Sequence, residues 1–216
     1  MLQTYLWYYM YMDGGALNFD TLAEDNIRTL NVPTATFKKP LCVVLVGIPA
    51  SGKSILASKL AEKFPLTVLN EEYITGFLIP KTSVFTRNSP EVFQLATKTI
   101  EHLLVVGKAC IYDSNVKTRE QRELIKKITA EAGGSYLLIY LNCSKETCYE
   151  RLQKHNLDVA RGEAKGYILD KDLFEYEVAS TSLPAPDESH ITYGCENPEG
   201  VFQVIPLIES RMREGT

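Results

Sequence analysis

The sequence contains no long hydrophobic run, no excess of basic residues and few histidines. No stretch of about 18 or more apolar residues occurs, so we expect no transmembrane helix and no membrane partner. Lysine and arginine total 23 against 27 aspartates and glutamates, and the net charge of −4 gives the chain no general attraction for polyanions. The three histidines are scattered, without the spacing of metal ligands. These absences argue against a membrane-spanning protein, and nucleic-acid binding would need a local basic cleft.

Cysteine is also scarce, with five residues and no C-x-x-C pair. Cys42, Cys110 and Cys143 lie in apolar runs that predict strands. Buried, free thiols in a reducing cytosol explain this pattern better than a zinc site does. We therefore expect a cytoplasmic protein whose cysteines are free.

What the sequence does contain is the ordinary composition of a globular domain. Its 216 residues are 45% apolar and 23% charged, enough for one domain with a substantial core. From residue 41 onward, apolar runs that suit buried strands alternate with segments that carry apolar residues at helical spacing. The predicted strands are 41–46, 66–69, 108–112, 135–141 and 189–194. The predicted helices are 54–64, 90–106, 118–132, 144–155, 170–180 and 201–213.

This alternation is typical of βαβ units in a three-layer α/β fold with a mostly parallel, five-stranded sheet. We expect the strand that runs into Asp113 to lie beside the strand that begins at Leu41, with ligands at the carboxyl ends. Residues 1–40 fit this pattern poorly, so we divide the chain into an N-terminal extension of unknown role, 1–40, and one domain, 41–216. The aromatic string from Tyr5 to Tyr11 resembles an edge hairpin or a vector remnant more than a base-stacking surface, because no basic residues interleave with it.

Between the first predicted strand and helix lies a segment that fits the phosphate-loop pattern G-x-x-x-x-G-K-[ST]. It consists of Gly47, Ile48, Pro49, Ala50, Ser51, Gly52, Lys53 and Ser54. Such a turn points successive backbone N–H groups inward around a phosphate, and the helix N-terminus adds partial positive charge. We expect the loop to bind ATP, Lys53 to reach the β- and γ-phosphates as a catalytic residue, and the Ser54 hydroxyl to ligate Mg²⁺.

Asp113 is the candidate for a second magnesium-ordering group. It stands at the C-terminal end of an apolar strand, which is the position of a Walker B acid. An aspartate that ends a strand is also a common turn residue or helix cap. Given the phosphate loop, we predict that Ser54 and Asp113 hold the metal together.

From Leu41 to Glu188 the chain resembles the P-loop kinases grouped with polynucleotide 5′-kinase and zeta toxin. The matching parts are the loop 47–54, the segment Leu69-Asn70-Glu71-Glu72-Tyr73, the segment Asp113-Ser114-Asn115 followed by Arg119 and Arg122, Glu150-Arg151-Leu152 with a polar stretch to Arg161-Gly162, and the proline-acid tail 184–188. The resemblance implies a P-loop NTPase kinase fold. It also implies transfer of the γ-phosphate of ATP to a hydroxyl acceptor.

In the family the first acid after the second strand accepts the proton of the acceptor hydroxyl, and that position is Glu71 here. A carboxylate near the γ-phosphate can take this proton as the new bond forms. Glu72 is the substitute base and a candidate substrate-binding residue. The alternative is that Glu71 and Glu72 are an exposed pair at a helix start, favoured by the helix dipole.

The resemblance also implies an arginine-bearing lid, which we place near 155–166. Arg151 and Arg161 flank it as candidate catalytic residues, with Arg161 the first choice, because transfer spreads negative charge that arginines can stabilise. Arg122, on the helix after Asp113, is a candidate substrate-binding residue. Each of these arginines could instead be an ordinary surface residue.

The sequence departs from the family pattern at two places. Polynucleotide kinases carry an arginine three residues after the base, and here that position is Ile74. The acids are also glutamates, not aspartates. Both changes disfavour a nucleic-acid acceptor. We therefore expect an ATP- and Mg²⁺-dependent kinase of a hydroxyl acceptor, which could be a nucleotide, a nucleic-acid end or a small metabolite. An ATP-binding switch with little transfer activity, and an interaction module built on residues 1–40, are the alternatives.

Overall fold

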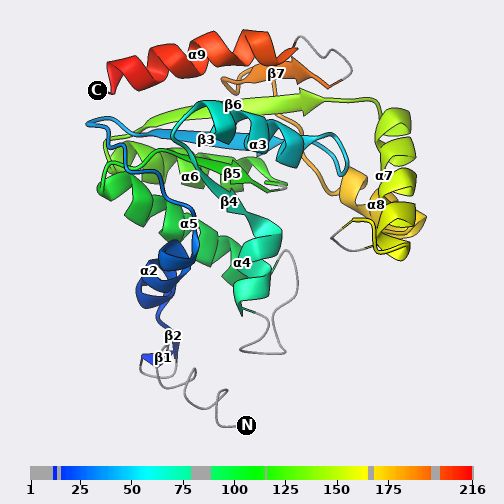
Figure 1. The fold of residues 1–216 in the computed structure, drawn as a ribbon, viewed down its shortest axis with the longest axis horizontal. Coiled ribbons are helices and arrows are strands. Elements are labelled where there is room, and N and C mark those ends of the chain that lie inside the picture. Colours follow the sequence, from blue (N-terminus) through cyan, green and yellow to red (C-terminus); the bar gives the residue numbers. More distant parts are fainter. Residues whose placement is uncertain are drawn as a thin grey trace.

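The computed structural model of the protein describes residues 12–13, 16–78, 89–114, 116–164, 168–195 and 200–215. A five-stranded sheet forms its centre, with the strand order β4-β5-β3-β6-β7 (Figure 1). The strands are β3 (Leu41–Val46), β4 (Thr67–Asn70), β5 (Cys110–Asp113), β6 (Ser135–Asn142) and β7 (Ile191–Gly194). Every neighbouring pair is parallel. The predicted fold class is confirmed, and β3 and β5 are neighbours as expected.

Helices cover both faces of the sheet. These are α2 (Phe19–Thr29), α3 (Lys53–Lys63), α4 (Glu71–Leu78), α5 (Pro90–Val105), α6 (Arg119–Glu131) and α9 (Val201–Glu214). Two further helices, α7 (Lys145–Ala160) and α8 (Lys171–Ala179), lie beyond the sheet. Because side chains alternate along a strand, β3 feeds two cores. Cys42, Val44 and Val46 pack with α2, α4, α5 and α6 on one face. Leu41, Val43 and Leu45 pack with α3 and α9 on the other face.

The helix starts predicted from capping residues agree with the structure. The Ser89 hydroxyl accepts from the Val92 N–H ahead of α5. Thr118 and Gln121 form a reciprocal capping box at α6, and Ser144 caps α7. Each cap satisfies an N–H group that the helix leaves unpaired.

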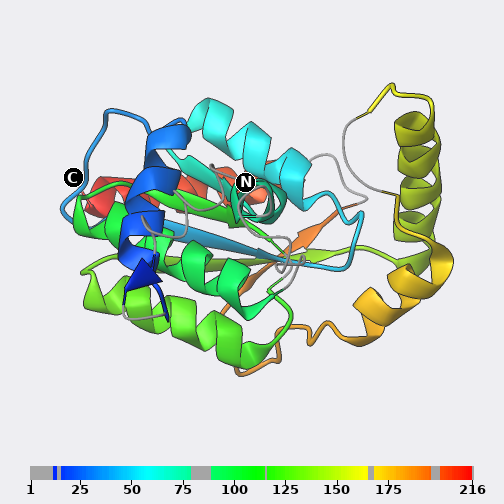
Figure 2. The ribbon, with the colours of Figure 1, turned by 90° about the horizontal axis from the view of Figure 1, so that it is seen from below.

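The predicted polar lid at 155–166 is partly helical. α7 continues to Ala160, so residues 155–160 form its last turns. Asn156 fixes this end of the helix, because its amide donates to the Leu169 carbonyl at 2.7 Å and accepts from the Leu169 N–H at 3.1 Å. Figure 1 and Figure 2 show α7 and α8 as an arm beyond the carboxyl ends of the strands. Residues 165 and 166 of the predicted lid lie outside the described residues.

The N-terminal region contributes a helix that the sequence pattern did not predict. Leu22 and Ala23 of α2 are fully buried in the core cluster with α5, and Asn26 donates to the Thr99 hydroxyl at 3.2 Å. α2 thus packs in the same core as elements that follow residue 41. The division of the chain into 1–40 and 41–216 stays a prediction. Ahead of it, β1 (Met12–Asp13) and β2 (Ala16–Leu17) pair antiparallel. The string from Tyr5 to Tyr11 lies outside the described residues.

None of the helices in the described ranges has the length and apolar character needed to cross a bilayer.

One cysteine prediction is wrong. Cys143 forms a disulfide with Cys195 across a sequence separation of 52 residues, with the Cα atoms 5.3 Å apart. Parallel pairing of β6 with β7 sets Asn142 opposite Gly194, so the next residue of each chain segment meets its counterpart. Cys42, Cys110 and Cys148 are buried thiols outside this disulfide.

Candidate active site

The phosphate loop joins β3 to α3 through a backbone that few residues adopt. Gly52 has a φ of 99° and Ala50 a φ of 61°, both in the left-handed region. At Gly47, a Cβ would lie 2.7 Å from the Ser51 Oγ and 3.1 Å from the Leu141 carbonyl oxygen. Close packing therefore favours glycine at position 47, and the torsion angle favours it at position 52.

The loop is equipped to receive an anion. Gly52 has no side chain with which to cap α3, the arrangement in which helix N–H groups bind phosphate. The Lys53 ammonium donates to the carbonyl oxygens of Gly47 at 2.8 Å and Ile48 at 3.1 Å, which holds its charge over the loop. The Ser51 hydroxyl is buried with no hydrogen-bond partner in the described part of the chain. A buried donor of this kind suits a loop that takes phosphate oxygens, because an unpaired buried polar group is costly.

Two carboxylates stand at the carboxyl ends of β4 and β5. Asp113 is 4% exposed and accepts from the Asn70 amide at 2.7 Å, since the register sets these residues opposite each other. Glu71 is 7% exposed, and the Ser114 hydroxyl donates to its Oε2 at 2.6 Å. Burial, reinforced by the charge of Glu71, raises the pKa of Tyr112 well above its usual range. The predicted base and the predicted metal ligand are thus both nearly buried, and each accepts a hydrogen bond from a neighbour.

Asn70 is a site residue that the motif comparison did not single out. Its side-chain oxygen accepts from the N–H groups of Glu72 at 2.9 Å and Tyr73 at 3.2 Å, so it starts α4. Its amide nitrogen holds Asp113. The signal in the sequence was an asparagine immediately before a helix, which is a standard cap. Glu72 itself is exposed.

Family membership follows from the extent of the sequence match. Residues 42–170 match the family described as "AAA domain", and this range covers β3 to the residue that precedes α8. The chain belongs to this AAA domain family. No curated protein matches the sequence.

Solved structures resemble this AAA domain protein over most of its length. A candidate kinase from Chloroflexus aurantiacus j-10-fl has a TM-score of 0.64 at 18% identity, covering 83% of this chain and 99% of its own. A sugar kinase from Janibacter sp. HTCC2649 has a TM-score of 0.57 at 16% identity, covering 82% and 99%. Kti12 from Chaetomium thermophilum, in complex with ADP-AlF3, has a TM-score of 0.58 at 17% identity, covering 79% and 98%. At these identities the similarity shows the fold, which is that of a P-loop kinase.

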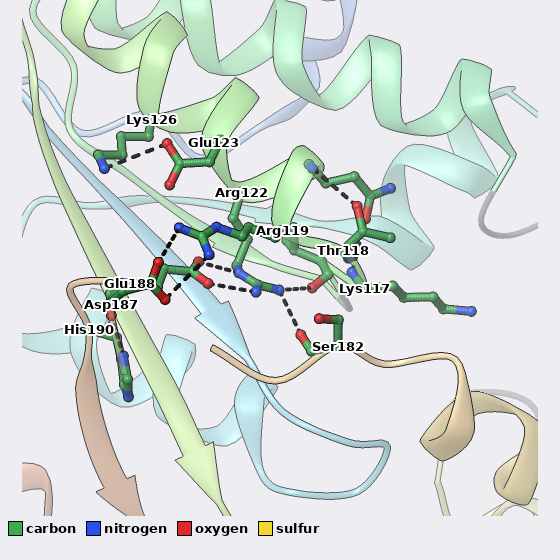
Figure 3. Close-up of polar contacts among 12 residues, drawn as sticks. Lys117, Thr118, Arg119, Arg122, Glu123, Lys126, Ser182, Asp187, Glu188 and His190 are labelled. Carbon is green, nitrogen blue, oxygen red and sulfur yellow. Dashed lines mark hydrogen bonds and ion pairs between the residues drawn. The ribbon is translucent and has the colours of Figure 1, made fainter. Parts of the chain in front are cut away.

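Arg122 of the AAA domain has a structural task that the sequence prediction missed. Its side chain is 1% exposed, and it pairs with Glu188 through Nε at 2.5 Å and Nη2 at 2.8 Å. Nη1 donates to the Ser182 carbonyl at 2.8 Å (Figure 3). The guanidinium fastens the tail 182–188 to α6, so the substrate-binding role predicted for it has no support in this placement.

Of the two predicted lid arginines, Arg151 lies within α7 and Arg161 follows its last residue. Arg151 donates through Nη1 to the Cys143 sulfur at 3.4 Å and through Nη2 to the Cys195 carbonyl at 3.3 Å. Arg161 is the C-cap residue of α7 and is exposed. Arg151 therefore braces the disulfide, while Arg161 stands at the end of the arm.

The arm of the AAA domain packs on the phosphate loop. A small apolar cluster of Cys148, Leu152, Leu169 and Phe174 holds α7 to α8, and Ile48 and Ala50 of the loop lie against it. An ion pair between Lys117 and Glu177, at 2.9 Å, ties α8 to the segment before α6. The arm and the phosphate loop are therefore in direct contact, so a shift of α7 or α8 would alter the packing around Ile48 and Ala50.

Replacing Glu188 by glutamine should lower the free energy of unfolding at pH 7 by about 3–5 kcal/mol, because Arg122 would keep a buried charge without its partner. The hydrogen bond from Arg122 holds the pKa of Glu188 below its ordinary value of 4.5. A lowered folded-state pKa adds stability above that value, and this stability is lost as the pH falls through the folded pKa. Urea unfolding at pH 7 and pH 3 should show a smaller acid loss in Glu188→Gln than in the wild type.

Asp187→Asn is the matched control for this experiment. Asp187 immediately precedes Glu188 and pairs with Arg119 at 2.8 Å, but the side chains of this pair are exposed. Exposed pairs contribute little, so this variant should keep the wild-type unfolding midpoint at pH 7. Equal effects of Glu188→Gln and Asp187→Asn would contradict the structural role of the buried pair.

Reduction of the Cys143–Cys195 disulfide should destabilise the protein by about 4 kcal/mol in the chain-entropy description, given the 52-residue separation. The measurement is urea unfolding with and without a dithiol reductant. The double variant Cys143→Ser/Cys195→Ser is the control, because its midpoint should not respond to reductant. If the wild type unfolds at one midpoint under both conditions, the cross-link has no stabilising role.

Proposed function

We propose that the protein is an ATP- and Mg²⁺-dependent phosphotransferase that carries the γ-phosphate to a hydroxyl acceptor. The observation that carries this proposal is the pair of nearly buried carboxylates, Glu71 and Asp113, at neighbouring strand ends of a sheet whose third strand feeds the phosphate loop. Nucleotide complexes of structural neighbours, Kti12 with ADP-AlF3 and the Mycobacterium tuberculosis APS kinase CysC with AMPPNP and APS, support nucleotide use.

The phosphate loop is proposed to bind the nucleotide. Its backbone N–H groups and the start of α3 surround the phosphates, and the Lys53 ammonium moves from the loop carbonyls to the phosphate oxygens. The Ser54 hydroxyl and the Asp113 carboxylate are oxygen donors of the kind that Mg²⁺ prefers. When bound, Mg²⁺ supplies positive charge that neutralises the phosphates during transfer.

Glu71 is proposed as the general base. The hydrogen bond that Ser114 donates to Oε2 fixes the plane of the carboxylate that would take the acceptor proton. Glu72, exposed beside it, is proposed to contact the acceptor and is the substitute base. Arg161 is proposed to stabilise the transferring phosphoryl group, and Arg151 to support it by positioning α7.

Within the P-loop kinases we propose a place near the polynucleotide 5′-kinase and zeta-toxin group. The acidic pair that opens α4 and the Asp113-Ser114 sequence support this grouping. Ile74 counts against a polynucleotide acceptor for a structural reason. Its side chain is fully buried in the core cluster, so this position of α4 faces inward and has no means to grip a substrate phosphate.

The proposal is tested with γ-labelled ATP and a panel of hydroxyl acceptors: 5′-hydroxyl DNA and RNA, nucleosides, nucleotide sugars and small polyols. Labelled product with at least one acceptor is expected. Binding of ATP, measured by calorimetry, without product from any acceptor would instead favour a nucleotide-binding switch. Loss of both binding and transfer would overturn the assignment of the phosphate loop.

A further inference from the structure

A hollow of about 310 Å³ lies beside β4, the last strand on one side of the sheet. Its described lining consists of Thr29, Leu30, Asn31, Val68, Asn70 and Tyr73. Three of these residues come from the end of α2 and the segment after it. They precede the range 42–170 that matches the AAA domain family, so this wall belongs to the chain's own N-terminal region.

One lining side chain, that of Asn70, connects the hollow to the proposed catalytic carboxylates. Asn70 lines it, and the amide of Asn70 donates to Asp113 at 2.7 Å. Glu71, the proposed base, is the next residue along the chain. The Tyr73 hydroxyl donates to the Thr29 carbonyl at 3.3 Å. This hydrogen bond joins the start of α4 to the N-terminal wall of the hollow. A molecule in the hollow would therefore lie one side chain away from the proposed metal ligand.

The lining has the chemistry of a sugar site. All six described lining residues are uncharged. Tyr73 is 49% exposed and offers an aromatic ring, Leu30 and Val68 add apolar surface, and Asn31 offers an amide donor and acceptor. A phosphate or carboxylate placed against these residues would lose water without gaining an opposite charge. The volume lies at the small end of ligand sites, about 300–1,000 Å³, which suits one ring and not a polymer.

We infer that the acceptor is an uncharged sugar ring, either a free monosaccharide or the sugar of a nucleoside, and that Asn31 and Tyr73 contribute to its selection. This inference rests on the proposed phosphotransferase function. In the reaction, an acceptor oxygen bonds to the γ-phosphorus while the bond from that phosphorus to the β–γ bridging oxygen breaks. ADP leaves, and the acceptor proton passes to Glu71.

The test compares acceptors that differ in charge. Initial rates are measured with γ-labelled ATP for D-glucose against D-gluconate, and for cytidine against cytidine 3′-monophosphate. The uncharged member of at least one pair is expected to have a kcat/KM about 10-fold or more above that of its charged partner, equivalent to about 1.4 kcal/mol. The two pairs separate a free sugar from a nucleoside as the source of the ring.

Variants at Asn31 connect the preference to the hollow. Asn31→Ala should raise the KM of the preferred acceptor by about 2- to 10-fold, the effect of one lost hydrogen bond, and leave the KM of ATP unchanged. Asn31→Lys should shift the preference toward the charged partner. Thr34→Ala is the matched control, because Thr34 is exposed on the same segment and is not among the described lining residues. Its carbonyl accepts from the Lys108 ammonium at 2.7 Å, and this contact survives the substitution.

The possible failures are distinguishable. Preference for the charged partners, or a preference that no Asn31 variant changes, overturns the inference and leaves the phosphotransferase proposal intact. Absence of transfer to every acceptor overturns the proposed function. In that case, saturation-transfer NMR with D-glucose and cytidine tests whether the hollow binds neutral ligands. Binding that Asn31→Ala weakens supports a neutral-ligand site, and absence of binding overturns it.

Discussion

Replacing Lys53 by alanine should reduce kcat for phosphoryl transfer by about 10³-fold. Lys53 carries the positive charge held over the phosphate loop by the carbonyls of Gly47 and Ile48. Removing one donor that stabilises charge in a transition state costs about 10²–10³ in kcat, and a lysine that also binds the β- and γ-phosphates adds a loss of ATP affinity. Initial rates and calorimetric ATP binding would measure both parts.

Lys59→Ala is the control for this variant. Lys59 lies on the same helix, α3, and is exposed. It should keep the wild-type kcat and ATP affinity, and both variants should unfold at the wild-type urea midpoint. If Lys53→Ala transfers phosphate at the wild-type rate, the loop is not the nucleotide site, whatever its sequence pattern.

The sequence predicted the parts of the molecule that depend on local rules. The phosphate loop follows from the left-handed torsion angle at position 52 and the close contacts that disfavour a side chain at position 47. The starts of α5, α6 and α7 follow from caps that involve residues three positions apart. The sheet class follows from apolar runs that have no polar face, such as β3. Each of these signals lies within a few residues of the feature that it predicts.

The features that the sequence missed depend on pairings between distant residues. Cys143 and Cys195 meet only because β6 and β7 are parallel neighbours. Arg122 is buried because the tail returns Glu188 to α6, 66 residues further along the chain. Without knowledge of this partner, Arg122 was predicted to bind substrate. In the structure its guanidinium is occupied by the ion pair with Glu188. The same holds for α2, whose apolar residues are recognisable as core only against α5.

Substituting Glu71 by glutamine should lower kcat by 10²–10⁴-fold, the usual contribution of a general base. Glutamine keeps the size of the side chain and an oxygen that can accept the hydrogen bond from Ser114. The fold and the KM of ATP should therefore stay unchanged, because only the ability to take a proton is lost. Single-turnover measurement with γ-labelled ATP isolates this step from product release.

Variants of Glu72 and Ser114 test which carboxylate is the base and whether Ser114 orients it. Glu72→Gln should lower kcat by less than 10-fold if Glu71 is the base, and the order of the two effects reverses if Glu72 takes the proton. Ser114→Ala should lower kcat with little change in the KM of ATP, and Ser114→Thr should restore it, because threonine returns the hydroxyl that orients the carboxylate. A Glu71→Gln enzyme within 10-fold of the wild type would remove Glu71 from the mechanism. Failure of threonine to rescue would mean that Ser114 supports packing at this strand end and not the orientation of the base.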